Sequence, residues 1–333
     1  MPWNLFASSG GLELDPETCL QIVEYVEYSP ETMRTLRCLS NSFNELLSKY
    51  EQSICRTIAS EQMSPRETLV SDCIRCAACA AKAKALRDKA REQRAKSFKR
   101  PLKSSTIHDS SKVIQIYTYP WLSELDFRAR MTQELLDDRI MSLIPPQNHT
   151  APSGFLNSGL GILEARLEDL KRNALELLFL LADVASPSNN CQSIRAAQEE
   201  AITDLTPQQL ALLDMIAVTF ASSYGSQQRK TRVKVEDVTA IREEQYVFED
   251  RVLKYGPFFV WSHVFGNQEW VRQRMHEGMQ EMRDFEAGLE HAKAGLPSVV
   301  SRTFCSKAGC SFSDRWAKMD VVCDEMLNLS TRA

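Results

Sequence analysis

The sequence predicts an all-α protein with an N-terminal three-helix module, a basic helical arm and an irregular C-terminal helical bundle. Only 12 of the 333 residues are glycines, which leaves few positions for the tight turns that connect many short strands. Apolar residues recur over long segments at intervals of three and four, the period of a helix face. Residues 113–119 alone have the β-branched and aromatic composition of a strand. Because one strand cannot form a sheet, we expect this segment to lie extended on helices.

The first domain, residues 1–70, is predicted from its helix start signals. Asp15–Glu17 and Ser29–Glu31 each place a capping side chain before a proline and an acid, the order that favours the first turn of a helix. A third helix is predicted to begin near Ser40, with apolar residues continuing to Ile58. Three short helices would then pack into a compact module.

The second segment, residues 71–112, is predicted to be a solvated helical arm followed by a polar linker from residue 104. Residues 82–103 hold ten Lys or Arg against Asp88 and Glu92, a net charge of +8, which leaves −12 for the rest of a chain whose total is −4. The arm could contact phosphates or act as a nuclear-import signal. Phe98 is its only aromatic residue, so it lacks the stacking platform of single-strand binders, and we do not expect a nucleic-acid partner. Its candidate basic patch consists of Lys82, Lys84, Arg87, Lys89, Arg91, Arg94, Lys96, Lys99 and Arg100.

The third domain, residues 113–333, is predicted to be a helical bundle without internal repeats. Leucines spaced by three and four predict a helix over residues 163–181. Thr206–Gln209 is a capping box that would begin a helix ending near Gly225. Further helices are expected over residues 235–255 and 269–293, the second of them ended by Gly295 and Pro297.

The aromatic block at residues 255–270 has two readings. Large aromatic side chains anchor many protein interfaces, but at helical spacing they also fill cores, and we expect the core reading here. His263 lies within the block, apart from any metal-binding or catalytic pattern, so we expect a packed or partly exposed imidazole.

Motifs for chemistry are incomplete or missing. Cys73, Cys76 and Cys79 have a spacing that suits thiolate ligands, but they lack a clear fourth ligand and can also pack as small helical residues. We predict no metal and no cofactor, although the spacing leaves metal binding by these cysteines open. Phosphate-binding, dinucleotide-binding and nucleophile-elbow motifs do not occur, so we do not expect an enzyme.

The expected compartment is the cytoplasm or the nucleus. The N-terminal residues lack the basic and apolar regions of a secretory signal. No apolar stretch approaches the roughly 18 to 20 residues that cross a bilayer, so we expect no membrane association through a spanning helix.

Residues 12–58 resemble an F-box. The matching residues are Leu14–Glu17, then Ile22–Val23, then Leu36–Phe43, in the order of that family's Leu-Pro-x-Glu start and Leu-Arg-x-Val-Ser-basic-x-Phe segment. The layout is similar to F-box-like proteins common in filamentous fungi. Pro16 stands one position later than the family's proline, and Asn41–Ser42 replaces its usual basic residue.

The resemblance implies a module that docks on a Skp-type adaptor of a cullin ubiquitin ligase while the remaining chain recruits an unknown substrate protein. An exposed apolar face at Leu14, Pro16 and Val23 would favour this interpretation, whereas a strongly acidic or basic groove would favour its alternatives. The residues expected to form the module's core and adaptor-facing surface are Leu14, Pro16, Glu17, Ile22, Val23, Leu36, Leu39 and Phe43. The alternatives are a non-catalytic scaffold or nuclear regulator that uses the basic arm, and an unrecognised helical enzyme.

Overall fold

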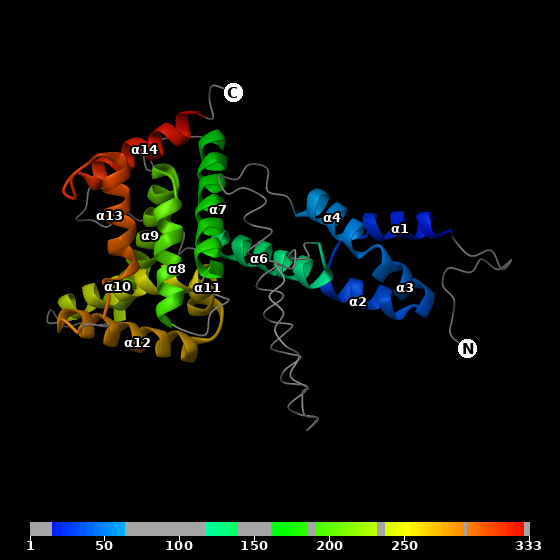
Figure 1. The fold of residues 1–333 in the computed structure, drawn as a ribbon, viewed down its shortest axis with the longest axis horizontal. Helices are drawn as coiled ribbons and strands as arrows, with labels where there is room; N and C mark the ends of the chain where they lie inside the picture. The colour runs from blue at the N-terminus through cyan, green and yellow to red at the C-terminus, as the bar shows by residue number, and fades with distance from the viewer. Residues whose placement is uncertain are drawn as a thin grey trace. The chain divides into compact units, whose positions relative to one another are not determined.

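The computed structural model describes residues 15–63, 117–138, 161–184, 191–231, 237–289 and 292–329. These residues form thirteen helices and no strand, which confirms the all-α prediction (Figure 1). The chain divides into two compact units, one of residues 1–66 and 76–130 and the other of residues 67–75 and 131–333. The predicted basic arm at residues 71–112 lies outside the described residues.

The first unit begins with three helices, α1 (Pro16–Tyr25), α2 (Pro30–Cys38) and α3 (Asn41–Lys49). The predicted caps Asp15 and Ser29 are confirmed, and Ser40 caps the third helix: each accepts a hydrogen bond from the backbone N–H three residues later. Each bond satisfies one of the donors that a helix leaves unpaired in its first turn. Local sequence signals therefore determine where these three helices begin.

The predicted third helix is wrong as a single element, because it breaks at Tyr50. Tyr50 has φ −105° and ψ 16°, and a fourth helix, α4 (Glu51–Gln62), follows it. The break lets α3 pack on α2 while α4 packs on α1. The Gln62 side chain accepts a hydrogen bond from the Tyr28 N–H (2.9 Å) and donates to the Val26 carbonyl (3.2 Å), which binds α4 to the end of α1.

The first unit also includes the beginning of α6 (Tyr119–Asp137), which differs from the predicted domain boundary at residue 113. The Tyr119 hydroxyl donates to the Leu47 carbonyl (3.0 Å), and its N–H donates to Glu51 Oε1 (2.7 Å). Trp121 is buried in the same core, because α6 covers apolar surface that α1 to α4 leave open. Residues 113–116 of the predicted extended segment lie outside the described residues. The core consists of Cys19, Val23, Tyr28, Met33, Phe43, Leu47, Ile54, Cys55, Ile58, Tyr119, Trp121 and Leu122.

The second unit is built around α9 (Pro207–Thr231), which contacts four other helices (Figure 1). Its capping box is confirmed by reciprocal bonds between Thr206 and Gln209 (2.9 and 3.2 Å). The helices that contact α9 are α7 (Gly161–Val184), α10 (Asp237–Tyr255), α13 (Leu296–Ala308) and α14 (Arg315–Leu329). The others are α8 (Cys191–Asp204), α11 (Pro257–Phe265) and α12 (Gln268–Glu286).

Two predicted helix ends in this unit are wrong. The helix predicted to stop near Gly225 continues to Thr231, because Gly225 makes room for the Gln245 side chain of α10. A Cβ at Gly225 would lie 2.1 Å from Gln245 Nε2. The charged helix predicted to reach residue 293 ends at Glu286, and Gly288 follows with φ +71°. The predicted terminators, Gly295 and Pro297, instead begin α13.

Candidate functional site

An exposed apolar pair lies on α1. Cys19 and Val23, four residues apart, face the core of the first unit, and Val23 is 1% exposed. Ile22 and Tyr25 lie on the solvent side of the same helix, where they are 38% and 89% exposed. A tyrosine ring held almost fully in water is an apolar surface that a partner could cover. We call Pro16, Glu17, Ile22 and Tyr25 the α1 surface.

The start of α1 is fixed by Asp15. Its two carboxylate oxygens accept hydrogen bonds from the Thr18 N–H (2.9 Å) and the Thr18 hydroxyl (2.8 Å). Both bonds favour the charged form and lower the pKa of Asp15. Pro16 follows at the first helical position, so the apolar pair extends from a helix whose first turn is capped and rigid.

The residues predicted to serve adaptor binding separate into a surface group and a core group. Pro16, Glu17 and Ile22 are exposed on α1. Val23 and Phe43 are buried, so the exposed apolar face that would favour adaptor binding is absent at Val23: this side chain faces the core because it lies one turn after Cys19. Leu36 and Leu39 are partly buried and pack against the core, and Leu14 lies outside the described residues.

Tyr25 is the surface residue that the sequence reasoning missed. The signal that could have found it was the helical phase of α1, because Cys19 and Val23 define its buried stripe and Tyr25 stands two positions after Val23, away from that stripe.

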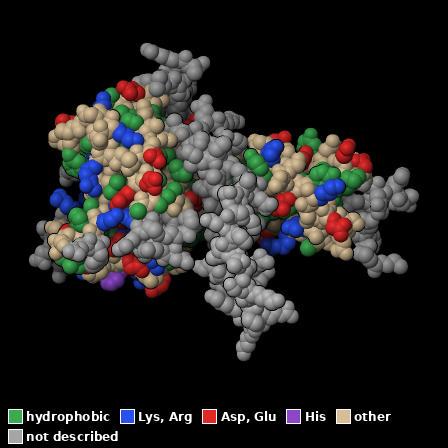
Figure 2. Space-filling view, in the orientation of Figure 1, with side chains coloured by type: hydrophobic (Ala, Val, Ile, Leu, Met, Phe, Trp, Pro, Cys, Tyr) green, Lys and Arg blue, Asp and Glu red, His purple; other side chains and the backbone are tan. Residues whose placement is uncertain are grey.

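On the visible face of the described residues, acidic and basic side chains are interspersed rather than gathered by sign (Figure 2).

The aromatic block in the second unit is divided between core and surface. Phe259 is fully buried, as the core reading predicts, and His263 packs edge-on against the Phe248 ring (5.3 Å between centroids). Burial lowers the pKa of His263. Phe258 and Phe265 remain exposed on α11 (38% and 47%), so part of the block also offers apolar surface to solvent.

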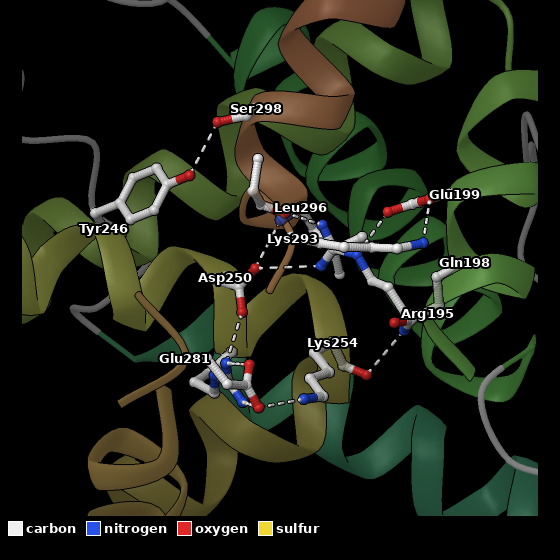
Figure 3. A network of polar contacts seen from close by, with 12 residues as sticks. Arg195, Gln198, Glu199, Tyr246, Asp250, Lys254, Glu281, Lys293, Leu296 and Ser298 are labelled. Atoms are coloured by element: carbon white, nitrogen blue, oxygen red, sulfur yellow. Dashed lines mark hydrogen bonds and ion pairs between the residues drawn. The ribbon is translucent and has the colours of Figure 1, made fainter. Parts of the chain in front are cut away.

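A polar network centred on Asp250 joins helices of the second unit (Figure 3). Asp250 Oδ1 accepts a hydrogen bond from the Leu296 N–H (2.6 Å) and lies 3.6 Å from Arg195 Nη1. Asp250 Oδ2 lies 3.0 Å from Arg251 Nη2, and Arg251 also pairs with Glu281. One carboxylate therefore connects α8, α10 and the first N–H of α13.

The charges of this network are mutually compensated. Lys254 Nζ lies 3.0 Å from Glu281 Oε1. Burial opposes the charged form of Glu281, but the hydrogen bond and charge of Arg251, with Lys254, outweigh it and lower the pKa of Glu281. Burial likewise opposes the charge of Arg251, and Asp250 and Glu281 reverse that effect and raise the pKa of Arg251. Each of these groups has an opposite charge beside it, so removal of one partner would leave the other without compensation.

A second buried cluster pairs two acids, Asp214 of α9 and Glu249 of α10. Asp214 is 1% exposed, and among the described residues neither of its carboxyl oxygens accepts a hydrogen bond. Burial raises its pKa to about 6, although Arg315, whose Nε lies 3.9 Å from Oδ2, opposes the change. Burial and the charge of Asp214 raise the pKa of Glu249. Paired acids can serve acid–base chemistry, but Asp214 is closed to solvent.

The basic patch at residues 82–100 and the cysteines at 73, 76 and 79 lie outside the described residues. Within the described ranges, no three His, Cys, Asp or Glu side chains group in a way that could hold a metal ion. Nor does any helix in those ranges combine the length and apolar composition needed to cross a membrane.

Comparisons of this chain with protein-family models, with curated proteins and with solved structures find no match. The interpretation of the α1 surface therefore depends on the geometry of the first unit and on the order of its sequence motifs.

Proposed function

We propose that this chain is a protein-interaction adaptor whose first unit binds a Skp-type adaptor of a cullin ubiquitin ligase and whose second unit recruits a substrate protein. The observation that carries the proposal is the α1 surface, where Ile22 and Tyr25 are exposed on a helix that Cys19 and Val23 attach to the core. This helix opens the segment that resembles an F-box, so the exposed pair lies where the resemblance implies a docking partner.

The energetics favour a partner that covers Tyr25. An aromatic side chain that becomes buried at an interface removes about 150–250 Å² from water and often dominates the binding free energy. Loss of such an anchor typically costs about 2 kcal/mol, which corresponds to roughly thirtyfold in affinity. Because Tyr25 contributes so little to the core, its substitution should affect binding without unfolding the unit.

The test is a pull-down of the full chain with a purified Skp-type adaptor. The test variant is Ile22→Glu with Tyr25→Ala, and the matched control is Leu289→Glu, which alters an equally apolar and 44% exposed position in the second unit. The proposal expects capture of the wild-type chain and of the control, and loss of capture for the α1 variant. Equal capture of all three chains, with circular dichroism unchanged, would contradict the α1 surface as the docking site.

The two alternative functions predict different outcomes of the same experiment. A scaffold or nuclear regulator would depend on the basic arm at residues 82–103 and would need no Skp-type adaptor. A helical enzyme would need accessible acid–base groups, and Asp214, the acid with a raised pKa on α9, is buried. Folded wild-type protein that fails to capture the adaptor would reject the proposal and favour the scaffold.

A further inference from the structure

The C-terminus of α13 brings residues 305 and 310 together. Gly309 has φ +64°, the left-handed conformation that reverses the chain at the end of many helices. The Cys310 N–H then donates to the Cys305 carbonyl (3.1 Å), the bond between residues five apart that defines a Schellman motif. In this motif the side chains of these two residues meet, and a hydrophobic contact commonly occupies the position.

In this chain both meeting residues are cysteines. The Cys305 thiol donates to the Ser311 carbonyl oxygen (3.7 Å), and Cys310 lies close enough to Cys305 to help raise the pKa of its thiol. Both thiols are free and partly exposed. A Cβ built on Gly309 would meet nothing within 4 Å, so the turn is open to solvent beside the pair. A small reagent can therefore reach two adjacent thiols.

The surroundings of Cys305 distinguish the two sulfurs. Burial and the hydrogen bond with Cys310 raise the pKa of Cys305, and Asp214 acts in the same direction, while Arg315 opposes them. Cys305 therefore carries less thiolate at neutral pH than an ordinary cysteine. Cys310 stands beyond the last residue of α13, in the open turn. This difference assigns the first attack on an oxidant to Cys310 and the second step to Cys305.

We propose that Cys305 and Cys310 are a redox-active dithiol that a small disulfide of the glutathione class converts to an intramolecular disulfide. The Cys310 thiolate attacks one sulfur of glutathione disulfide, whose S–S bond breaks and releases one glutathione thiolate. The Cys305 thiolate then attacks the Cys310 sulfur of the mixed disulfide and releases the second glutathione. The two cysteines lose two electrons and two protons, which the glutathione disulfide gains as two thiols. This site is independent of the α1 surface and of adaptor binding.

The test uses the folded full-length chain in a buffer of reduced and oxidised glutathione, quenched with iodoacetamide and digested with trypsin. Cleavage after Arg302, Lys307 and Arg315 places the two cysteines on separate peptides, residues 303–307 and 308–315. Their disulfide therefore appears in mass spectrometry as one cross-linked pair of peptides. We expect this pair to exceed the glutathione adducts of the same two cysteines by about tenfold, because the motif gives the thiols a high effective concentration.

Three controls make the result decisive. Exposed Cys38 should form only a glutathione adduct in the same sample. The Cys305→Ser variant should carry glutathione on Cys310 and give no cross-linked peptide. The wild-type chain should lose most of the cross-link in about 8 M urea, because urea at this concentration unfolds the turn that holds the two thiols together. Separate adducts or unmodified thiols at Cys305 and Cys310 in the folded chain, or equal cross-linking with and without urea, would overturn the proposal.

Discussion

The buried acid Asp214 should make this protein less stable as the pH rises, and its replacement by asparagine should remove that loss. Asp214 is 1% exposed on α9, and its nearest opposite charge is Arg315 Nε, 3.9 Å away. Burial raises its pKa from 3.8 to about 6 despite Arg315. An asparagine side chain at this position would have nearly the same shape as the protonated acid but could not ionise.

The magnitude follows from the difference between the two pKa values. The folded state still binds the Asp214 proton in the range between pH 3.8 and 6, where the unfolded chain has released it. The unfolding free energy therefore falls as the pH rises through this range, and the loss is complete above pH 6. A difference of about two pKa units corresponds to about 3 kcal/mol. Removing the Asp214 charge also relieves Glu249, which adds stability in the same direction.

The assay is guanidinium unfolding of the wild type and of Asp214→Asn between pH 4 and pH 8, followed by tryptophan fluorescence. The unfolding free energy of Asp214→Asn minus that of the wild type should grow by about 2 kcal/mol from the acid to the alkaline end, because part of the total loss has already occurred at pH 4. Asp320, whose pKa burial also raises to about 6, is present in both chains and cancels in the difference. Exposed Asp204→Asn is the matched control and should show little growth. A difference for Asp214→Asn that does not change with pH would refute the reasoning.

Three further substitutions test individual contacts by chemical or thermal unfolding. Gly278→Ala should destabilise the second unit by about 1–3 kcal/mol, because its Cβ would lie 2.4 Å from Val247 Cγ1; unchanged stability would mean that α12 does not pack closely on α10. Asp250→Ala should cost about 3–5 kcal/mol, because it leaves buried Arg251 without its partner on α10; a cost below about 1 kcal/mol would contradict the network's role. Tyr119→Phe should cost about 1 kcal/mol through the lost bond to the Leu47 carbonyl, and no change would argue against the placement of α6 in the first unit.

The helix starts could be predicted because their causes are local. Asp15, Ser29 and Ser40 bond to N–H groups only three residues away, and the Thr206–Gln209 capping box spans four residues. Hydrogen bonds of this range depend on the order of neighbouring residues alone, so the sequence contains the whole signal.

The missed boundaries have non-local causes. Gly225 does not end α9, because its missing side chain leaves space for Gln245 of another helix. Tyr50 breaks a continuous apolar pattern so that α3 and α4 can pack on different helices. Tyr119 joins the first unit through a bond to a residue 72 positions earlier. The periodicity of apolar residues within one segment carries no information on contacts with distant segments, so it could not predict these boundaries.

The sequence predicted the local part of the candidate site but not the contacts between residues far apart in the chain. The motif order indicated α1 and placed Ile22 and Val23 together among the candidate residues, whereas the structure exposes Ile22, buries Val23 and exposes Tyr25, which was missed. The helical phase that separates them was readable from the sequence. The Asp250 network was not, because Arg195 and Asp250 come from positions 55 apart in the chain.

The proposal that α1 docks a Skp-type adaptor is tested most directly by isothermal titration of the full chain with that purified adaptor. We expect saturable one-to-one binding, weakened by at least about tenfold in the Ile22→Glu, Tyr25→Ala variant, since the exposed ring would supply much of the binding free energy. The Leu289→Glu control should bind as the wild type does. A folded wild-type protein that gives no saturable heat would contradict the proposal. Equal affinities of the Ile22→Glu, Tyr25→Ala variant and the Leu289→Glu control would contradict it as well.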